Sequence, residues 1–385
     1  MAARPVRCSE AALSTPAPAE VRIHEAMTTL GVEEEFLLVH PVTRDVVSLG
    51  ARVAEAAVPE LGDVVTGELT QAQVETATPV CADLAAVRRE LGRLRAGLAR
   101  AAEAEGVRLA ALAVPALPGE PPAISDKPRY RAIADHFGPV AEDQGVCGCH
   151  VHVGMPDRNT AVRVGTAVRP WLPTLLALTA GSPLWRGRDT GYASWRSMLW
   201  SRWPVSGPTP AFGNAAQFDA VVDALVTSGV VLDEAQVYWT VRASAVHPTL
   251  EVRVSDVCAT VDEAVLLAAL VRALAITAAE ALRRGDSPPV PQELLVAAHW
   301  RAARSGLEGV AVDVLSGRPR PAWTVVDTLV EWVRPALVAL GDLAEVEHLL
   351  AGLRAGGSNA ARQRAVVREG GSILDVVDSL VVRPC

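Results

Sequence analysis

The sequence lacks the signatures of several large protein classes. No uninterrupted apolar run approaches the roughly 20 residues that span a bilayer, so a membrane enzyme is not expected. There is no Walker A sequence, no Gly-rich dinucleotide fingerprint and no Gly-x-Ser-x-Gly elbow, so neither P-loop nor hydrolase chemistry is supported. The net charge of −8 gives no general attraction to phosphate polymers, which makes nucleic acid an unexpected partner.

Cysteine is also scarce. Six cysteines in 385 residues are too few for a disulfide framework, and Cys147 and Cys149 are separated by one residue rather than two. We therefore expect reduced thiols and a cytoplasmic protein. Residues 1–27 are rich in Ala, Pro and Ser and lack the apolar segment of a secretory signal, so we expect a disordered N-terminal extension. No repeat or linker divides residues 28–385, which predicts a single domain.

The order of apolar patterns predicts the fold class. Alternating patterns and short apolar runs predict strands at 30–39, 68–76, 107–114, 147–154, 237–242 and 250–256. Three- and four-residue spacings predict helices at 81–106, 163–180, 261–284, 291–305, 322–340, 342–355 and 360–369. Everything after Val261 is thus expected to be helical, and the tryptophan-rich segment 182–210 is expected to be a loop. This order predicts an α+β fold, with helices layered on one face of a largely antiparallel sheet.

The first candidate site lies on the strand at 30–39. Side chains two residues apart on a strand point to the same face, so Glu33 and Glu35 lie together, opposite Val32 and Phe36. Glu34 falls on the apolar side, where the pattern assigns it no role. Two neighbouring carboxylates repel unless a cation lies between them. For an isolated pair, a solvated sheet face is the commoner explanation.

Three further strands carry polar residues on one face and change that balance. These residues are Gln71, Gln73 and Glu75 on one strand, His150 and His152 on the next, and Glu251, Arg253 and Ser255 on the third. In one sheet, these faces would form a patch of carboxylates and imidazoles. Such ligands suit magnesium or manganese ions that hold phosphates.

Zinc is the competing interpretation, because Cys147, Cys149, His150 and His152 are also possible ligands. The spacing argues against it, since Cys149 and His150 point to opposite faces of their strand. Structural zinc usually takes ligand pairs separated by two to four residues. A carboxylate-rich site with one histidine therefore fits a magnesium–nucleotide enzyme better.

Arginines form the second half of the expected site. Four of them, Arg186, Arg188, Arg196 and Arg202, lie in the tryptophan-rich segment, and Arg362 and Arg364 follow the stretch 356–359. A guanidinium binds carboxylate or phosphate with two parallel hydrogen bonds, so this cluster suits a substrate carboxylate and a nucleotide triphosphate. The alternative, for any single one, is a surface arginine in a chain that contains one lysine.

These motifs resemble a known family. The stretches are Gly31–Glu35, Gly148–Gly154, Trp185–Ser194 and Pro248–Arg253, and the likeness extends from about Thr28 to Glu369. They resemble the bacterial glutamate–cysteine ligase type 2 family, also called the carboxylate-amine ligases. That family shares the glutamine synthetase-like catalytic fold. The resemblance implies a curved, largely antiparallel sheet that forms a funnel, with nucleotide at one end and amino acid at the other.

The resemblance also implies roles for individual residues. Magnesium or manganese would be held by Glu33, Glu35, Glu75, His150 and Glu251, with Glu68 a weaker candidate because its strand parity differs from that of Glu75. Catalytic roles fall to Arg253 at the γ-phosphate, His152 at substrate or phosphate, and Arg188. Substrate and nucleotide binding falls to Arg186, Arg196, Arg202, Tyr192, Gln73 and Arg362.

The function implied is ATP-dependent formation of a γ-glutamyl-type amide. An unactivated carboxylate is first phosphorylated by ATP, and an amine then attacks the acyl-phosphate and expels phosphate. The expected partners are amino acids, ATP and a second copy of the chain in a homodimer. The alternatives are a phosphotransferase that acts on a guanidino or carboxylate group, a ligase for another amino-acid pair, and a binding protein that has lost activity.

Overall fold

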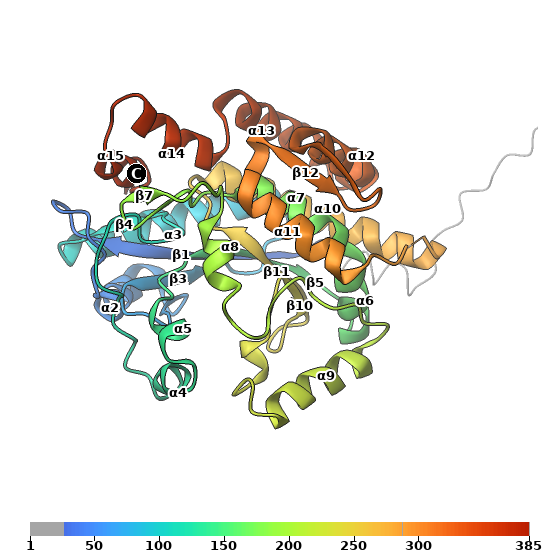
Figure 1. Cartoon of the computed structure of the whole chain (residues 1–385), viewed down its shortest axis with the longest axis horizontal. Helices are drawn as coiled ribbons and strands as arrows, with labels where there is room; N and C mark the ends of the chain where they lie inside the picture. The colour runs from blue at the N-terminus through green and yellow to red at the C-terminus, as the bar shows by residue number, and fades with distance from the viewer. Residues whose placement is uncertain (1–26, 287, 385) are drawn as a thin grey trace, which may run out of the picture.

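A seven-stranded antiparallel sheet forms the centre of the computed structural model, which describes residues 27–286 and 288–384. The strand order is β10-β11-β5-β1-β3-β2, with β4 beside β1 (Figure 1). The strands are β1 Leu30–Val39, β2 Val65–Gly67, β3 Gln73–Ala77, β4 Arg108–Ala110, β5 Gly148–Gly154, β10 Val241–Ala243 and β11 Thr249–Asp256. The expected N-terminal extension lies outside the described residues except for Met27, which is buried.

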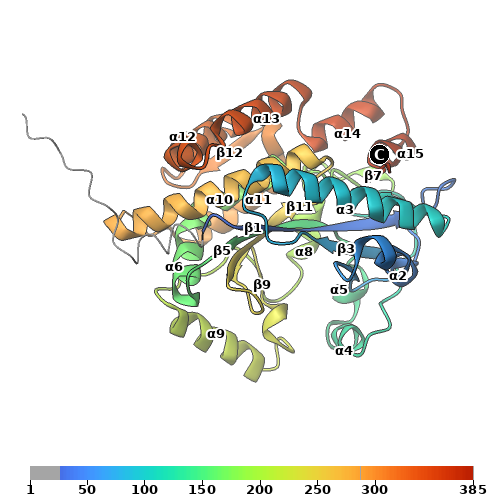
Figure 2. The same ribbon diagram turned by 180° about the vertical axis from the view of Figure 1, so that it is seen from behind.

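Helices cover one face of this sheet. The long helices α3 (Leu84–Ala104) and α10 (Val261–Arg284) pack on β1 and β5 and on each other, and α12 (Ala322–Leu340) and α13 (Leu343–Gly356) pack on α10 (Figure 2). The predicted α+β fold with a largely antiparallel sheet is confirmed. Helix α10 is long and apolar enough to cross a membrane, but 83% of its apolar window is buried inside the fold. It is a core helix of the layer that supports the sheet.

The remaining elements surround this centre. The helices are α2 Gly50–Leu61, α4 Pro128–Phe137, α5 Pro139–Glu142, α6 Arg158–Val168, η1 Arg169–Trp171, α7 Leu172–Thr179, α8 Trp195–Trp200, α9 Ala215–Thr227, η2 Glu234–Gln236, α11 Gln292–Ser305, η3 Gly306–Glu308, α14 Asn359–Arg368 and α15 Ile373–Ser379. Three short strand pairs are β6 Leu184–Trp185 with β7 Arg188–Asp189, β8 Ser206–Gly207 with β9 Tyr238–Trp239, and β12 Val310–Asp313 with β13 Arg318–Pro321.

Several predicted elements differ from the structure. The segment 182–210, expected to be a loop, contains α8 and the short strands β6, β7 and β8. The helix expected at 163–180 is broken into α6, η1 and α7, because Pro170 and Pro173 cannot donate helical hydrogen bonds. The all-helical third after Val261 is interrupted by the β12–β13 hairpin, whose turn contains Gly317 with a φ of 66°. The strand expected at 68–76 is regular strand only in its second half: residues 68–72 connect β2 to β3 through a turn in which Thr70 bonds to Gln73, and β3 begins at Gln73.

The strand register determines which side chains share a face. Glu33 pairs with His150, and Glu35 pairs with Glu75 on the other neighbour of β1. On β5, His152 pairs with Glu251. Directly opposed residues in an antiparallel pair point to the same side. The carboxylates and imidazoles therefore gather on the face that α3 and α10 do not cover.

A bulge in β11 changes one assignment. The register shifts between Val252 and Ser255, so that Ser255 pairs with Cys149, whose side chain is buried in the core. Ser255 was expected on the polar face with Glu251 and is instead on the core face, because a bulge adds one residue to the strand. The shift brings Asp256 opposite Gly148 on the polar side.

The core face of β1 explains Glu34. Its side chain is fully buried and accepts hydrogen bonds from Arg95 of α3 at 2.5 and 2.8 Å. Arg95 also donates to the carbonyls of Cys258 and Ala259, so its charge and most of its donors are satisfied. This pair fixes α3 against the sheet behind the candidate site.

Candidate active site

A cavity of about 290 Å³ opens on the polar face of the sheet. All six predicted metal ligands line it: Glu33, Glu35, Glu68, Glu75, His150 and Glu251. His152, Arg253 and Gln73 line it as well. Side chains from α4, α8 and the β9 region form the opposite wall. The sheet therefore brings together nine residues that lie far apart in the sequence.

Glu33 is the central carboxylate of the cavity. Its oxygens belong to two groups in which all ligand atoms lie within 4.8 Å of one another. One group adds Glu75 and His150, and the other adds His152 and Glu251. Glu33 Oε2 lies 3.3 Å from His150 Nδ1, and Glu33 Oε1 lies 3.1 Å from His152 Nε2. Two overlapping groups of this size can each hold a divalent cation.

The two histidines differ in their environments. Burial and the nearby Arg253 lower the pKa of His150 to about 4, so its ring is neutral at pH 7. A neutral ring that donates from Nδ1 to Glu33 keeps a lone pair on Nε2, and this buried Nε2 has no hydrogen-bond partner. His152 Nδ1 is held by the Thr249 hydroxyl at 2.9 Å. Although burial opposes it, the hydrogen bond with Glu33 and the charge of Glu33 raise the pKa of His152. The neutral ring of His150, held at Nδ1 with Nε2 free, is the one suited to bind a metal ion.

The pKa values of two carboxylates on β1 and β3, Glu35 and Glu75, are raised. Burial, and then the charge of Glu68, raises the pKa of Glu35 to about 7. Burial and the same Glu68 raise the pKa of Glu75 well above its ordinary value. The Gly148 N–H donates to Glu35 Oε2 at 2.6 Å but does not offset these effects. Clustered carboxylates of this kind become fully ionised when cations bind among them.

Arginine balances the charge on the β11 side. Arg253 forms an ion pair with Glu251, and Arg242 donates to the same carboxylate at 2.7 Å. Although burial opposes it, these two guanidinium groups lower the pKa of Glu251. Arg253 Nε is buried without a hydrogen-bond partner. The arginine therefore keeps a donor that no described residue accepts.

Arg196 lies beside the cluster without lining the cavity. It is almost fully buried, and a side chain at Gly148 would collide with its guanidinium. Its charge opposes the rise in the pKa of Glu35. The segment that carries it is anchored by Asp256, which accepts hydrogen bonds from Gly181 N–H and from the hydroxyls of Ser182 and Ser194 at 2.7 to 2.9 Å.

The other arginines of the tryptophan-rich segment do not reach the cavity. Arg186 and Arg202 both pair with Asp143, and Arg188 is exposed on the short β6–β7 hairpin. The left-handed turn at Arg186 and Gly187 directs this hairpin away from the sheet. Of these four arginines, Arg196 alone lies next to the metal-ligand candidates in this structure, and the binding roles of Arg186, Arg188 and Arg202 stay predictions.

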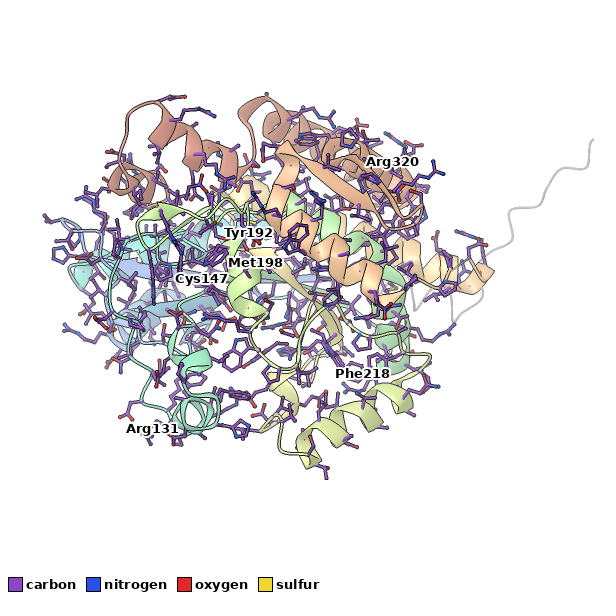
Figure 3. The ribbon with its side chains drawn as sticks, in the orientation of Figure 1. Arg131, Cys147, Tyr192, Met198, Phe218 and Arg320 are labelled. Atoms are coloured by element: carbon purple, nitrogen blue, oxygen red, sulfur yellow. The ribbon has the colours of Figure 1, made fainter. Side chains whose placement is uncertain are left out.

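Two further predicted contacts lie elsewhere. Arg362 pairs with Glu263 and donates to the Gly357 carbonyl at 2.7 Å. Tyr192, labelled in Figure 3, contacts Trp195 and lies under the guanidinium of Arg304. Gln73 lines the cavity, but its amide is used by Thr70 and the Val146 carbonyl. Neither Arg362 nor Tyr192 lines the cavity in this structure.

Sequence reasoning missed several residues of the cavity wall. Arg129, Tyr130, Tyr238, Arg242 and His247 all line it. The sequence could have predicted Arg242, because it lies between the apolar residues Val241 and Ala243 at the end of the strand predicted at 237–242. The others lie on α4 or in loops and short strands, where no period shows the direction of a side chain.

Comparison with known proteins identifies the family. The model of the glutamate-cysteine ligase family 2 matches residues 29–379. This chain belongs to that family. A protein of Nocardia farcinica with the provisional name glutamate–cysteine ligase 2-1 is 55% identical over 337 residues, which are 87% of this chain and 88% of that one. A provisionally named glutamate–cysteine ligase 2 of Salinispora arenicola is 49% identical over 93% of this chain and 95% of its own length.

Two solved structures share the fold. The glutamate–cysteine ligase of Francisella tularensis, solved in complex with AMP, has a TM-score of 0.66 at 12% identity, covering 91% of this chain and 87% of that one. A bifunctional glutathione synthetase of Pasteurella multocida has a TM-score of 0.66 at 17% identity. The match covers 94% of this chain and 53% of that protein, so this chain spans about half its length.

Proposed function

We propose that the chain is an ATP-dependent ligase that joins a carboxylate to an amine through an acyl-phosphate, in the manner of a glutamate–cysteine ligase. The observation that carries the proposal is the double use of Glu33, which belongs to two carboxylate–imidazole groups beside Arg253. Phosphoryl transfer needs positioning and charge neutralisation more than covalent help from the protein. Membership of the family and the names of the relatives support the ligase class.

The side chains of the cavity fit magnesium or manganese. We assign Glu33, Glu35, Glu75, Glu251 and His150 as ligands, with Glu68 as the sixth candidate. Oxygen-rich sites with one imidazole suit these ions. The unpaired Nε2 of His150 and the raised pKa values of Glu35 and Glu75 are features that bound dications would satisfy. When bound, the ions would neutralise the γ-phosphate of ATP and align it for transfer.

The base of ATP fits a neighbouring cavity of about 330 Å³. This cavity shares Glu33, His152 and His247 with the first, so the two meet at the metal-ligand candidates. Its other walls include apolar residues: Ala77, Pro79, Val80 and Pro248. We place the adenine there, because a flat base suits apolar walls and its phosphates would then point toward His152 and the carboxylates.

The amino-acid substrates would occupy the first cavity. One oxygen of the donor carboxylate attacks the γ-phosphorus, and the bond to the bridging oxygen of ADP breaks. The amine nitrogen then attacks the acyl carbon, phosphate leaves with that oxygen, and the amide remains. Arg253 is the group we assign to the transferring phosphoryl oxygens, because it lies among Glu33, Glu35 and Glu251 and keeps a free donor. Arg129, at the exposed rim, donates from Nε and Nη2 to Asp233 at 2.8 and 2.9 Å and is a candidate to bind the substrate carboxylate through Nη1.

The test is a screen of amino-acid pairs with ATP and magnesium that measures ADP release and product mass together. We expect glutamate with cysteine to be a productive pair, giving ADP, phosphate and a γ-glutamyl amide. ADP release that needs no amine, with a stable phosphorylated product, would instead establish the phosphotransferase. Absence of any nucleotide turnover across the screen would contradict both. We further propose that the enzyme acts in the cytoplasm as a homodimer.

A further inference from the structure

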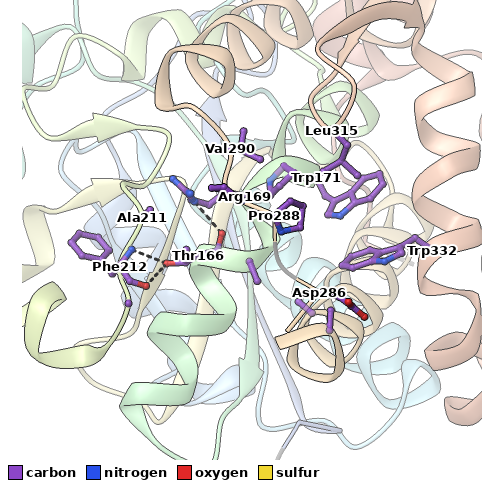
Figure 4. A pocket seen from close by; sticks show the side chains of 16 residues that line it. Thr166, Arg169, Trp171, Ala211, Phe212, Asp286, Pro288, Val290, Leu315 and Trp332 are labelled. Carbon is purple, nitrogen blue, oxygen red and sulfur yellow. Dashed lines mark hydrogen bonds between the residues drawn. The ribbon is translucent and has the colours of Figure 1, made fainter. Parts of the chain in front are cut away.

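A second large cavity lies among the helices, apart from the sheet face. Its volume is about 380 Å³, and none of its lining residues lines the cavity of the candidate active site. It lies between the end of α6 with η1, the loop before α9, the end of α10 and Trp332 of α12 (Figure 4). We call it the α6–α12 cavity.

A buried cation stands at one end of the α6–α12 cavity. Arg169 is 5% exposed, and its hydrogen bonds go to neutral acceptors: the carbonyls of Thr166 and Thr209 and the side chain of Gln292, at 3.0 to 3.2 Å. Those bonds use Nε and Nη1, and no described residue accepts a hydrogen bond from Nη2. No carboxylate of the described residues pairs with this guanidinium, whereas buried charges are ordinarily paired.

Aromatic side chains form the opposite end. The rings of Trp171 and Trp332 are stacked, with centroids 5.1 Å apart and planes inclined by 21°. The backbone of Phe212 lies near Arg169: its N–H donates to the Thr166 hydroxyl and its C=O accepts from it, each at 3.0 Å, while its ring packs against Phe218 and Trp239. These two bonds hold the loop at residues 211–213 against α6, and this loop forms one wall of the cavity (Figure 4).

We propose that the α6–α12 cavity binds a small organic monocarboxylate with a flat apolar body. A carboxylate can accept the two free donors of Arg169 Nη2 and supply the missing negative charge. The apolar body would lie against Trp171 and Trp332. A phosphate ester fits less well, because Arg169 is the only cation among the lining residues and Asp286 lies at the rim. The volume lies within the range of ligand pockets, about 300 to 1,000 Å³.

Arg169 also has a structural use, since it joins the backbone at Thr209 to Gln292. A decisive test therefore needs a variant that closes the cavity without touching this arginine. Ala211 lines the cavity and is exposed, so Ala211→Phe adds volume next to Arg169 and removes no described hydrogen bond. Arg169→Gln then tests the charge, and thermal unfolding reports whether each variant is folded.

The probes are indole-3-acetate and its uncharged analogue indole-3-acetamide. Each is added to the full chain in the presence of saturating ATP and magnesium, and isothermal titration calorimetry measures its binding. We expect the acid to bind at least tenfold more tightly than the amide, Ala211→Phe to abolish binding, and Arg169→Gln to remove the preference. Three results would overturn the proposal: no saturable binding of the acid, equal affinities for acid and amide, or unchanged binding in Ala211→Phe. Because binding is the readout, the test is independent of the proposed ligase activity.

Discussion

Asp256 Oδ1 accepts a hydrogen bond from the hydroxyl of Ser194 at 2.8 Å. This bond ties the bulged end of β11 to the start of α8, two residues before Arg196. The other carboxylate oxygen of Asp256 holds Gly181 and Ser182, so one buried side chain anchors both ends of the β6–β7 segment. The bulge in β11 turns Ser255 to the core face, where strand alternation did not predict it. The same bulge brings Asp256 to the polar face, where it can anchor this segment.

Asp256→Asn is the first prediction. The amide keeps the shape but replaces one acceptor by a donor, so a buried donor of Gly181, Ser182 or Ser194 loses its partner. We expect a loss of about 1 to 3 kcal/mol in the free energy of unfolding. Turnover should also fall, because Arg196 loses its fixed backbone. Urea unfolding and steady-state kinetics measure these effects.

The matched control is Asp378→Asn, which breaks the partly exposed pair of Asp378 with Arg44. It should cost less than about 1 kcal/mol and leave turnover unchanged. Equal effects of the two substitutions would show that Asp256 has no special anchoring role.

Glu33→Gln is the second prediction. It removes a ligand charge from both metal-ligand groups and keeps the side-chain shape. We expect turnover to fall by about 100-fold or more, with Mn²⁺ binding weakened to match. Electron paramagnetic resonance of Mn²⁺ measures the binding directly.

Glu60→Gln provides the control, since Glu60 pairs with Arg100 on the surface. It should bind Mn²⁺ and turn over like the unmodified protein. Near-normal Mn²⁺ affinity in Glu33→Gln would mean that the polar sheet face is solvated surface rather than a metal site.

His299 makes stability depend on pH. This histidine is buried on α11, and burial lowers its pKa from 6.5 to about 4, although an interaction with the backbone of Leu295 opposes the shift. Between pH 6.5 and pH 4, His299 binds a proton in the unfolded chain but stays neutral in the folded chain. Its contribution to the free energy of unfolding is therefore complete above pH 6.5 and is lost as the pH falls toward 4. The loss from this residue should reach roughly 2 kcal/mol at pH 5.

His299→Leu removes this titration and should reduce the loss of stability between pH 7.5 and pH 5 by roughly the same 2 kcal/mol. Denaturant unfolding at the two pH values measures the difference. His348→Leu, at an exposed site, should leave the pH dependence unchanged. A slope in His299→Leu as steep as in the unmodified protein would contradict the buried neutral state.

Sequence reasoning predicted what depends on strand alternation. Glu33 and Glu35 share a face with His150, because every second residue of a regular strand points the same way. The same rule underrated Glu68, because a turn, and not a continuous strand, connects it to Glu75. Within β11 it failed beyond Arg253, because a bulge has no strong sequence signal.

The arginines show the second limit. Arg196 and Arg186 lie ten residues apart in one motif-rich segment, yet one is buried beside the cluster and the other pairs with Asp143. Which of them reaches the sheet depends on the turn at Gly187 and on the anchor at Asp256, two tertiary features. Residues such as Arg129 and Tyr238 come from elements packed across the cavity, and local pattern carries no information about that packing.

In the proposed mechanism, an acyl-phosphate links ATP hydrolysis to amide formation. Oxygen-18 placed in the donor carboxylate tests this intermediate most directly. The cavity gathers carboxylates with Arg242 and Arg253, which we propose hold metal ions and phosphate, so the donor oxygen should pass to the phosphoryl group. With labelled glutamate, ATP, magnesium and cysteine, mass spectrometry should find one oxygen-18 in each released phosphate, in step with amide formation. Label in AMP, or amide formation with unlabelled phosphate, would contradict the account.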